Sequence, residues 1–253
     1  MTLEYLKAEF KQLQDRPDTL EIRLYGEVKG DSYNYYTGEA IKSKTGQDYF
    51  VEQLEAYKNV KEIILYINSC GGSVEQGYGI YANLRRHPAH KTCYVDGFAN
   101  SIASIIAMAC DKIVMYSNSM MGIHNAMTIC IGNACELRKA ADDLDKLMEG
   151  NREIYLNRAN GKITLEQLTD LLDAETMLTA KECLDFGFCD EIDEGKQADA
   201  NAIQTATRQF SQSMTIAGKS LEEANRALEA TRQKRKDDSK EIDLYECIIK
   251  SFL

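Results

Sequence analysis

Hydrophobic and polar positions divide most of the chain into strand-like and helix-like stretches that follow one another. Residues 20–28 alternate apolar and polar side chains, which is typical of a strand with one buried face. Short, mostly apolar runs predict further buried strands at 62–68, 92–97, 112–117 and 121–125. Apolar residues at helical spacing predict helices at 48–59, 75–87 and 101–110. This alternation predicts an α/β domain with buried, largely parallel strands.

The second half continues this pattern with helices. A long helix is expected from about residue 133 to 160, followed by shorter helices at 162–172 and 179–187. Thr introduces each of the two shorter helices in a capping position. A last strand is predicted at 188–192, and residues 1–16 have the spacing of a short amphipathic helix.

Composition changes near residue 194 and suggests a domain boundary. Beyond it the chain has few large hydrophobes and a charged helical pattern with a weak apolar stripe. We therefore expect an N-terminal segment at 1–18, a folded domain at 19–194, and a polar appendage at 195–253 that is helical or partly disordered. The chain has 253 residues, of which 44% are hydrophobic, enough to form one domain core with such an appendage.

Net charge narrows the range of partners. The chain carries 40 acidic and 30 basic residues, a formal charge of −10. This balance argues against nucleic-acid binding, which depends on clustered Lys and Arg. No apolar run reaches the length of a membrane span, and the first residues lack the apolar core of a signal peptide. The expected location is therefore the cytoplasm, without membrane attachment.

The eight cysteines do not suggest a metal site or disulfides. They are scattered, form no CxxC pair, and several lie in apolar runs, so reduced and buried thiols are expected. His87, His90 and Cys93 have a ligand-like spacing, but Pro88 interrupts any helix there and no second cluster completes a site. No phosphate-binding G-x-x-x-x-G-K-[ST] loop is present. The sequence thus implies neither a metal nor a cofactor.

The stretch GFANSIAS, residues 97–104, places small and polar residues between two apolar segments. Ser101 could cap a helix, or it could act as a nucleophile if a histidine accepts its proton and backbone N–H groups face the substrate. His87 and His90 lie in a polar loop, so His124, at the end of an apolar strand, is the candidate base. The Gly-Gly pair in SCGGSV could bind an oxyanion or a phosphate, or form a simple bend.

Three ordered blocks resemble one family. INSCGGSVEQGYGIYANLRR resembles the INSPGGSV segment of the Clp proteolytic subunits, and VDGFANSIASIIAMACDKIVMYSNSMMGIHNA resembles their block with the nucleophile and histidine. ETMLTAKECLDFGFCDEI resembles the later block with the carboxylate. The resemblance covers residues 20–193 and implies a ClpP/crotonase-like spiral of β-β-α units with a protruding handle helix. Within this family, the motifs YGEV, VDG, MMGIHN and E-T-x-L-T-A most resemble those of phage and prophage head maturation proteases.

The resemblance assigns roles to individual residues. It makes Ser101 the nucleophile and His124 the general base, with the N–H groups of Gly72 and Ile102 as the oxyanion hole. The third member falls on Glu175, where Clp subunits usually carry Asp, and Asp173 is the alternative acid. Ser104 is expected to pack or cap. Asn100 stands where relatives commonly carry Ala, and it could polarise the site or bond the turn.

The resemblance also implies partners and a function. The expected activity is that of a serine endopeptidase that cleaves phage scaffold or coat proteins, inside a procapsid, as a homo-oligomeric ring interlocked by its handles. One alternative is a cellular Clp-like proteolytic subunit that works with a separate ATPase. Another is a catalytically inactive scaffold homologue. Crotonase-like hydratases and Ser-Lys peptidases share the broad fold, but the Gly-Ile-His at 122–124 argues against both.

Overall fold

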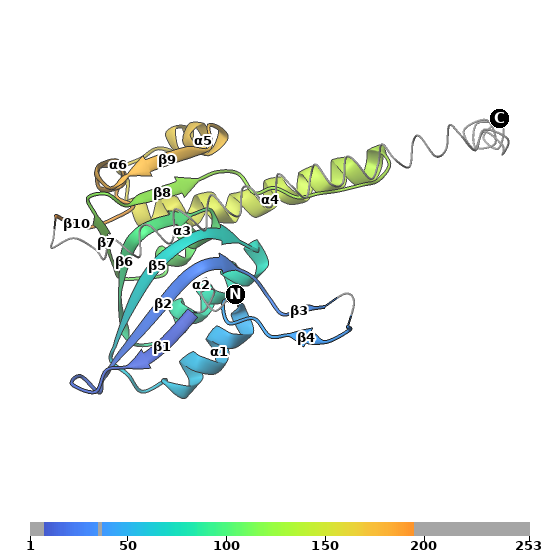
Figure 1. Ribbon diagram of the computed structural model, residues 1–253. Coiled ribbons are helices and arrows are strands. Elements are labelled where there is room, and N and C mark those ends of the chain that lie inside the picture. Colours follow the sequence, from blue (N-terminus) through green and yellow to red (C-terminus); the bar gives the residue numbers. More distant parts are fainter. Residues whose placement is uncertain (1–7, 35–36, 195–253) are drawn as a thin grey trace, which may run out of the picture. The chain divides into compact units, whose positions relative to one another are not determined.

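The computed structural model describes residues 8–34 and 37–194, so the predicted appendage at 195–253 lies outside the described residues. The strands are β1 (Ala8–Gln12), β2 (Thr19–Val28), β3 (Ser32–Tyr33), β4 (Ala40–Ile41), β5 (Glu62–Gly72), β6 (His90–Asn100), β7 (Lys112–Tyr116), β8 (Met120–Ile123), β9 (Thr176–Thr179) and β10 (Glu191–Asp193). The helices are α1 (Gln47–Ala56), α2 (Val74–Arg86), α3 (Ile102–Ala107), α4 (Ala134–Ala159), α5 (Leu165–Asp173) and α6 (Ala180–Phe186). Figure 1 shows their arrangement, which confirms the predicted alternation of strands and helices.

An eight-stranded sheet organises this part of the chain. Its main path is β1-β2-β5-β6-β7-β10, in which every neighbouring pair from β2 onward is parallel. β6 pairs with β7 over residues 92–95 and with β8 over residues 98–100, so the sheet divides along this strand. β9 then adds to β8 in antiparallel direction. The prediction of largely parallel strands is therefore confirmed.

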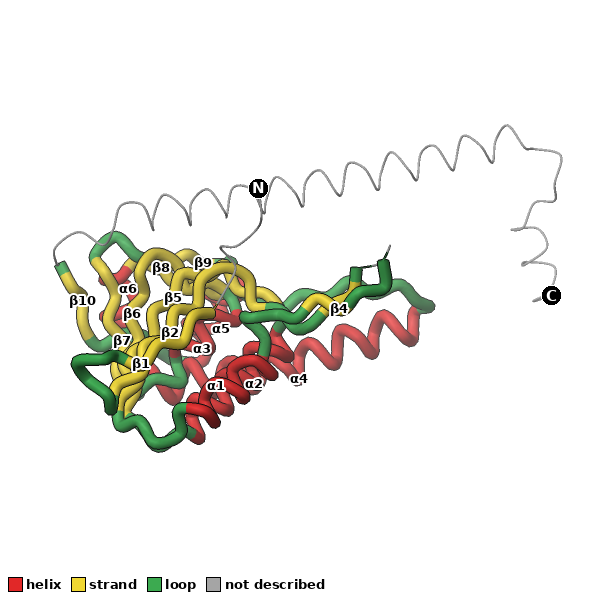
Figure 2. The backbone as a smooth tube through the Cα atoms, turned by 60° about the horizontal axis from the view of Figure 1, so that its bottom comes forward, coloured by secondary structure: helices red, strands yellow, loops and turns green. Residues whose placement is uncertain are grey.

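Helices cover one face of the sheet, as Figure 2 shows. Because side chains alternate between the faces of a strand, β5 directs Ile63, Leu65 and Ile67 into the core. The intervening positions face the other side, where the rings of Tyr66 and Tyr94 stack with 5.4 Å between their centroids. The sheet thus has one largely apolar face and one face that is partly open.

The predicted helix at 1–16 is wrong for the part that the structure describes. Residues 8–12 form β1, the edge strand, which pairs antiparallel with β2. Ala8 is buried, and Phe10, two residues later on the same face, contacts the rings of Tyr49 and Phe50 edge-on. In the sequence, Phe10 also fits a helical stripe with Leu6 and Leu13, whereas Ala8 fits only the strand, so the tertiary contact of Phe10 decided between the two periods.

Two helices, α5 and α6, begin at the Thr residues that the sequence predicted as caps. Thr164 accepts a hydrogen bond from the Gln167 N–H, and Thr179 accepts one from the Glu182 N–H. In each case the side chain of the later residue accepts from the backbone N–H of the Thr, which completes a capping box. The two predicted Thr caps are confirmed.

Helix α4 has a buried half and an exposed half. Its buried residues are Met148, Asn151, Tyr155 and Ala159, all in the C-terminal half and spaced to share one face. The N-terminal half projects beyond the sheet in Figure 1, which is the protruding helix expected from the sequence. Before it, Met127, Ile129 and Ile131 are 77%, 96% and 97% exposed.

The cysteines of the described residues are all free thiols. Four of them, Cys93, Cys110, Cys183 and Cys189, are buried as expected, and Cys70 is half-buried. The expectation of burial is wrong for Cys130 and Cys135, which are exposed next to the start of α4.

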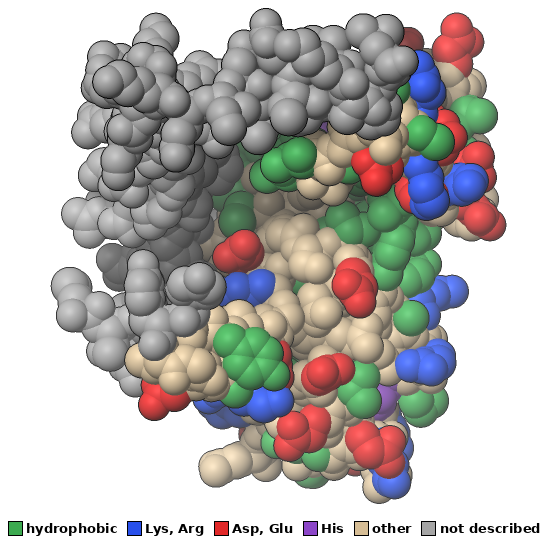
Figure 3. Space-filling model, turned by 90° about the vertical axis from the view of Figure 1, so that its right-hand side faces the viewer, with side chains coloured by type: hydrophobic (Ala, Val, Ile, Leu, Met, Phe, Trp, Pro, Cys, Tyr) green, Lys and Arg blue, Asp and Glu red, His purple; other side chains and the backbone are tan. Residues whose placement is uncertain are grey.

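Charged groups of both signs share the surface. Figure 3 shows acidic, basic and apolar side chains interspersed on the face that it presents. Exposed ion pairs include Lys139 with Asp143, at 2.5 Å, and Lys61 with Asp18, at 2.6 Å. Within residues 8–34 and 37–194, no helix combines the length and the apolar character that a membrane span requires.

Candidate functional site

Two neighbouring strands bring Ser101 and His124 to the same edge of the sheet. β6 and β8 are parallel, and Asn100, the last residue of β6, lies opposite Gly122. Ser101 follows Asn100 directly, and its N–H donates to the Gly122 carbonyl at 2.7 Å. His124 follows the end of β8 at Ile123. Because parallel strands end at the same edge, Ser101 and His124 both lie at this end of the β6–β8 pair.

The backbone of Ser101 is strained. Its φ of 55° and ψ of −130° lie outside the regions that a residue with a Cβ prefers. Ser101 stands at the N-terminus of α3, but its hydroxyl makes no capping hydrogen bond. Capping therefore does not explain why Ser stands here. Such strain is concentrated at functional sites, where the surrounding structure holds it.

The two glycines that end β5 lie directly beside Ser101. Their φ angles are 91° at Gly71 and 146° at Gly72. A Cβ at Gly71 would be 2.7 Å from the Ser101 Cβ and 3.3 Å from its Oγ, so only glycine leaves room for this serine. The family resemblance assigned a role to Gly72, and the structure shows that Gly71 is the glycine that packs directly against Ser101.

Cys70, the residue before the glycines, is a poor candidate for a reactive thiol. Burial raises the pKa of the Cys70 thiol, and the nearby Glu27 raises it further. A thiol with a raised pKa is less often a thiolate, which is the form that oxidants attack. The structure therefore does not favour the oxidation of Cys70 as a control of the site.

The His124 ring is half-buried and already hydrogen-bonded. Its Nδ1 is 2.6 Å from the backbone carbonyl oxygen of Asn125, so Nδ1 carries the proton and donates it. This tautomer leaves Nε2 as the nitrogen that can accept a proton. In the described part of the chain, Nδ1 is thus bonded to a carbonyl and to neither predicted acid.

The two candidate acids occupy different positions around this loop. Asp173 accepts a hydrogen bond from the Asn125 side-chain amide at 2.7 Å, so it contacts the residue after His124. Glu175 is exposed, has a φ of 50°, and directly precedes β9. Ile123 pairs with Thr176 at the end of the β8–β9 ladder, so His124 and Glu175 each lie one residue beyond its last pair.

Behind the Ser101 turn lies a small set of buried polar groups. Ser104 is fully buried, and its hydroxyl donates to the Ser101 carbonyl oxygen at 2.5 Å. The Tyr155 hydroxyl of α4 is 2.5 Å from the same Ser104 oxygen. The expectation that Ser104 packs or caps is consistent with these contacts. Asn100 is also buried, and among the described residues its Oδ1 has no hydrogen-bond partner.

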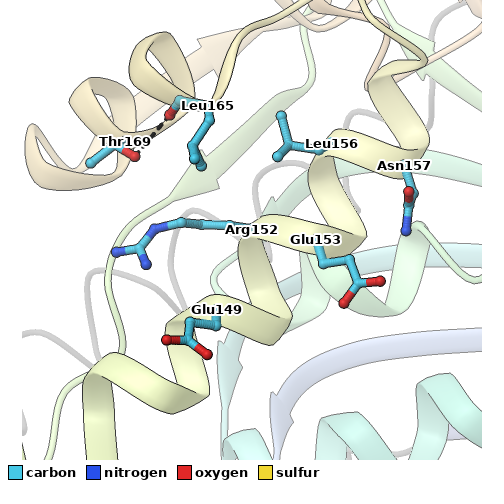
Figure 4. A pocket seen from close by; sticks show the side chains of 7 residues that line it. All are labelled: Glu149, Arg152, Glu153, Leu156, Asn157, Leu165 and Thr169. Carbon is cyan, nitrogen blue, oxygen red and sulfur yellow. Dashed lines mark hydrogen bonds between the residues drawn. The ribbon is translucent and has the colours of Figure 1, made fainter. Parts of the chain in front are cut away.

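A hollow of about 620 Å³ lies between α4 and α5 and contains none of the predicted site residues. Figure 4 shows its lining, which consists of Glu149, Arg152, Glu153, Leu156, Asn157, Leu165 and Thr169. The described residues contain no group of three or more His, Cys, Asp and Glu side chains that could hold a metal ion.

Two parts of the site could not be found from the sequence. Strand β9, which begins directly after Glu175, has only four residues and lies between two predicted helices. Tyr155 is one of several apolar positions in a long helix, and its contact with Ser104 spans 51 residues of sequence. The sequence signal for this contact was a Ser at position 104, three residues after Ser101 and inside an apolar run.

Comparisons with known proteins point to one family. A model of the Clp protease family matches residues 35–196. The ATP-dependent Clp protease proteolytic subunit of Ligilactobacillus salivarius is 30% identical over 178 residues, which cover 70% of this chain and 84% of that protein. The proteolytic subunit 1 of Protochlamydia amoebophila is 28% identical over 168 residues, covering 64% and 81%.

A solved structure shows the same fold. A point mutant of ClpP1 from Listeria monocytogenes superposes with a TM-score of 0.57 over 70% of this chain and 93% of its own, at 20% identity. The spiral fold expected from the sequence is therefore confirmed. With the family match across most of the described domain, this chain belongs to the Clp protease family and is a serine-type peptidase.

Proposed function

We propose that the chain is a serine endopeptidase in which Ser101 attacks the peptide carbonyl and His124 accepts its proton. The observation that carries this proposal is the position of Ser101. Its backbone is strained, its hydroxyl makes no capping hydrogen bond, and it lies beside the Gly71–Gly72 turn at the same sheet edge as His124. A serine in a strained turn beside backbone amides is the arrangement that acyl transfer requires.

The reaction then follows from the groups at this edge. The Ser101 Oγ bonds to the carbonyl carbon while its proton moves to Nε2 of His124. The N–H groups of Gly72 and Ile102 stabilise the oxyanion of the tetrahedral intermediate. His124 returns the proton to the leaving amine as the peptide bond breaks. A water molecule, deprotonated by the same nitrogen, then hydrolyses the acyl-enzyme and restores Ser101.

A fluorophosphonate probe tests this assignment directly. The probe should label the full chain at Ser101, as located by mass spectrometry, because only an activated serine displaces its leaving group quickly. Labelling should be lost in Ser101→Ala and strongly slowed in His124→Ala. A folded wild-type protein that takes up no probe would instead favour the inactive scaffold homologue.

We assign Glu175 as the orienting acid, in preference to Asp173. In support, Glu175 and His124 each lie one residue beyond the last pair of the β8–β9 ladder, whereas Asp173 accepts a hydrogen bond from the Asn125 amide. In the reactive arrangement, Nδ1 of His124 exchanges the Asn125 carbonyl for the Glu175 carboxylate. That exchange gives the imidazolium a negative partner when the proton arrives.

The two acids should differ in their effect on catalysis. Glu175→Gln should lower kcat by about 10²–10⁴-fold, because the amide cannot stabilise the imidazolium. Asp173→Asn should lower kcat by about tenfold or less, since it disturbs only the support of Asn125. Steady-state hydrolysis of a short fluorogenic peptide by both variants decides the matter. The opposite order of effects would transfer the acid's role to Asp173.

The substrate that we propose is a phage scaffold or coat protein, cleaved inside a procapsid. This finer proposal rests on the likeness of YGEV, VDG, MMGIHN and E-T-x-L-T-A to head maturation proteases. The alternative is a proteolytic subunit that works with a separate ATPase, and the names of the two bacterial relatives describe an ATP-dependent protease with a proteolytic subunit. Portal and capsid genes beside this one, and Ser101-dependent cleavage of their products on co-expression, would support the phage function. ATP-dependent degradation with a Clp ATPase would support the alternative.

Assembly into a homo-oligomeric ring is part of the same proposal. Met127, Ile129 and Ile131 alternate along an extended segment and are almost fully exposed in the single chain. A row of exposed apolar side chains of this kind marks a protein interface. The projecting half of α4 begins directly after this segment, so both elements could meet their counterparts in a second copy.

A further inference from the structure

The peptide unit between Ser101 and Ile102 joins two parts of the proposed machinery. Its N–H belongs to Ile102, which we assign to the oxyanion hole, and its carbonyl belongs to the nucleophile Ser101. A trans peptide is planar, so its N–H and its C=O point in opposite directions. Whatever holds the Ser101 carbonyl therefore also aims the Ile102 N–H.

Two hydrogen bonds from one residue hold that carbonyl. The Ser104 N–H donates to the Ser101 oxygen at 3.0 Å, and the Ser104 hydroxyl donates to it at 2.5 Å. The first of these belongs to the helical turn and would exist with any residue at position 104. The second requires a hydroxyl group at a position that is fully buried.

Tyr155 completes a chain of donors. Because the Ser104 hydroxyl donates its proton to the Ser101 carbonyl, its oxygen accepts from the Tyr155 hydroxyl at 2.5 Å. Burial raises the pKa of Tyr155, so this hydroxyl remains a donor over the working pH range. Donors in series polarise one another and strengthen each bond.

The other end of the peptide unit is fixed by packing. The Ile102 side chain is buried against α2, where a Cβ at Gly77 would be only 2.0 Å from Cγ1 of Ile102. The peptide is thus held from two sides. Ile102 packs against α2, and Tyr155 of α4 bonds to Ser104, which in turn bonds to the Ser101 carbonyl. A strained backbone such as that of Ser101 needs this support, since relaxation would rotate the peptide.

We propose that Ser104 and Tyr155 are positioning residues, which hold the Ser101–Ile102 peptide plane so that the Ile102 N–H faces the oxyanion. This inference rests on the proposed function. It adds that helix α4 contributes to transition-state stabilisation without touching the substrate.

Ser104→Ala and Tyr155→Phe test the inference on the full chain. Loss of one oxyanion donor costs about 10²–10³-fold in rate, and a misdirected donor should cost less, so we expect Ser104→Ala to lower kcat about 10–100-fold with little change in KM. Affinity for a peptide boronic acid, whose serine adduct is a tetrahedral anion, should fall in parallel. Tyr155→Phe should show the same pattern with a smaller loss.

The double variant separates positioning from stability. Ser104→Ala alone leaves the buried Tyr155 hydroxyl without its partner, which destabilises the fold, whereas the double variant removes both groups. We expect the Tm to recover in the double variant while kcat stays low. Recovery of kcat together with Tm would overturn the inference.

Ser119→Ala is the matched control. Ser119 is also buried, and its hydroxyl also donates to a carbonyl three residues earlier, that of Tyr116, at 2.8 Å. It should lower Tm and leave kcat unchanged. An active wild type with an equally active Ser104→Ala variant overturns this inference alone. A wild type that neither cleaves peptide nor binds the boronate overturns the proposed function and this inference together.

Discussion

Ser101→Ala should lower the rate of peptide hydrolysis by roughly 10⁴–10⁶-fold, because the remaining groups can bind and polarise a substrate but cannot form an acyl-enzyme. His124→Ala should cause a loss of similar size, since Ser101 is then a weak nucleophile. Together the two substitutions should cost little more than either alone, as expected of residues that act as one unit. Initial rates with a fluorogenic peptide, at equal concentrations of folded protein, measure all three effects.

His90→Ala is the control for the histidine substitution. His90 is exposed at the start of β6, at the opposite end of that strand from Ser101. It should keep the wild-type rate. Additive effects of Ser101→Ala and His124→Ala, or a residual rate above about one hundredth in either variant, would mean that the two residues do not form a catalytic pair.

Gly72→Ala should destabilise the protein more than any other single change at this edge of the sheet. A Cβ at this position would be 2.1 Å from the Val28 carbonyl oxygen, which also accepts the Ser73 N–H at 2.8 Å. The clash is with backbone, so β2 and β5 must separate or the turn must rearrange. We expect a loss of about 3 kcal/mol or more in the free energy of unfolding, and loss of the Gly72 N–H from its proposed position.

Gly161→Ala provides the comparison. Gly161 also has a positive φ, of 84°, but a Cβ there would have open space around it. This substitution measures backbone strain alone, which is about 1 kcal/mol in such cases. Chemical denaturation of both variants gives the difference. Equal losses would show that the contact with Val28 relaxes easily, and that Gly72 is required only for its φ.

Much of the fold follows from the sequence because the strands and helices are self-contained patterns. Ile63, Leu65 and Ile67 mark β5 by their alternation, and the Thr caps mark α5 and α6. β1 could not be distinguished in this way, since Phe10 has helical spacing with Leu6 and Leu13 in the sequence, and its contact with α1 decides for the strand. Local patterns fail where a distant contact sets the conformation.

In the candidate site too, local sequence patterns could be recognised, whereas features set by distant contacts could not. The order of GG, Ser and His along the chain, each near the end of a predicted strand, carried the resemblance from which their roles were expected. The bond from His124 Nδ1 to the Asn125 carbonyl depends on the backbone course of a loop, and the Asn125–Asp173 contact depends on how α5 packs. Neither hydrogen bond produces a periodic pattern in the sequence. The positive φ of Ser101 could not be predicted either, since the residues around a serine do not indicate a strained turn.

The pairing of β8 with β9 makes the position of the proposed catalytic residues independent of the length of the projecting helix. The chain leaves the sheet after Ile123, forms α4 and α5, and returns at Thr176, so the whole excursion is closed by one short ladder. Closing a longer or shorter excursion changes the entropy of the loop only slowly, by about 0.6 kcal/mol for each doubling of length. Whole turns could be gained or lost in the projecting half of α4 without moving His124 relative to Glu175. The architecture of an assembly can therefore diverge among relatives while the chemistry at the sheet edge remains the same.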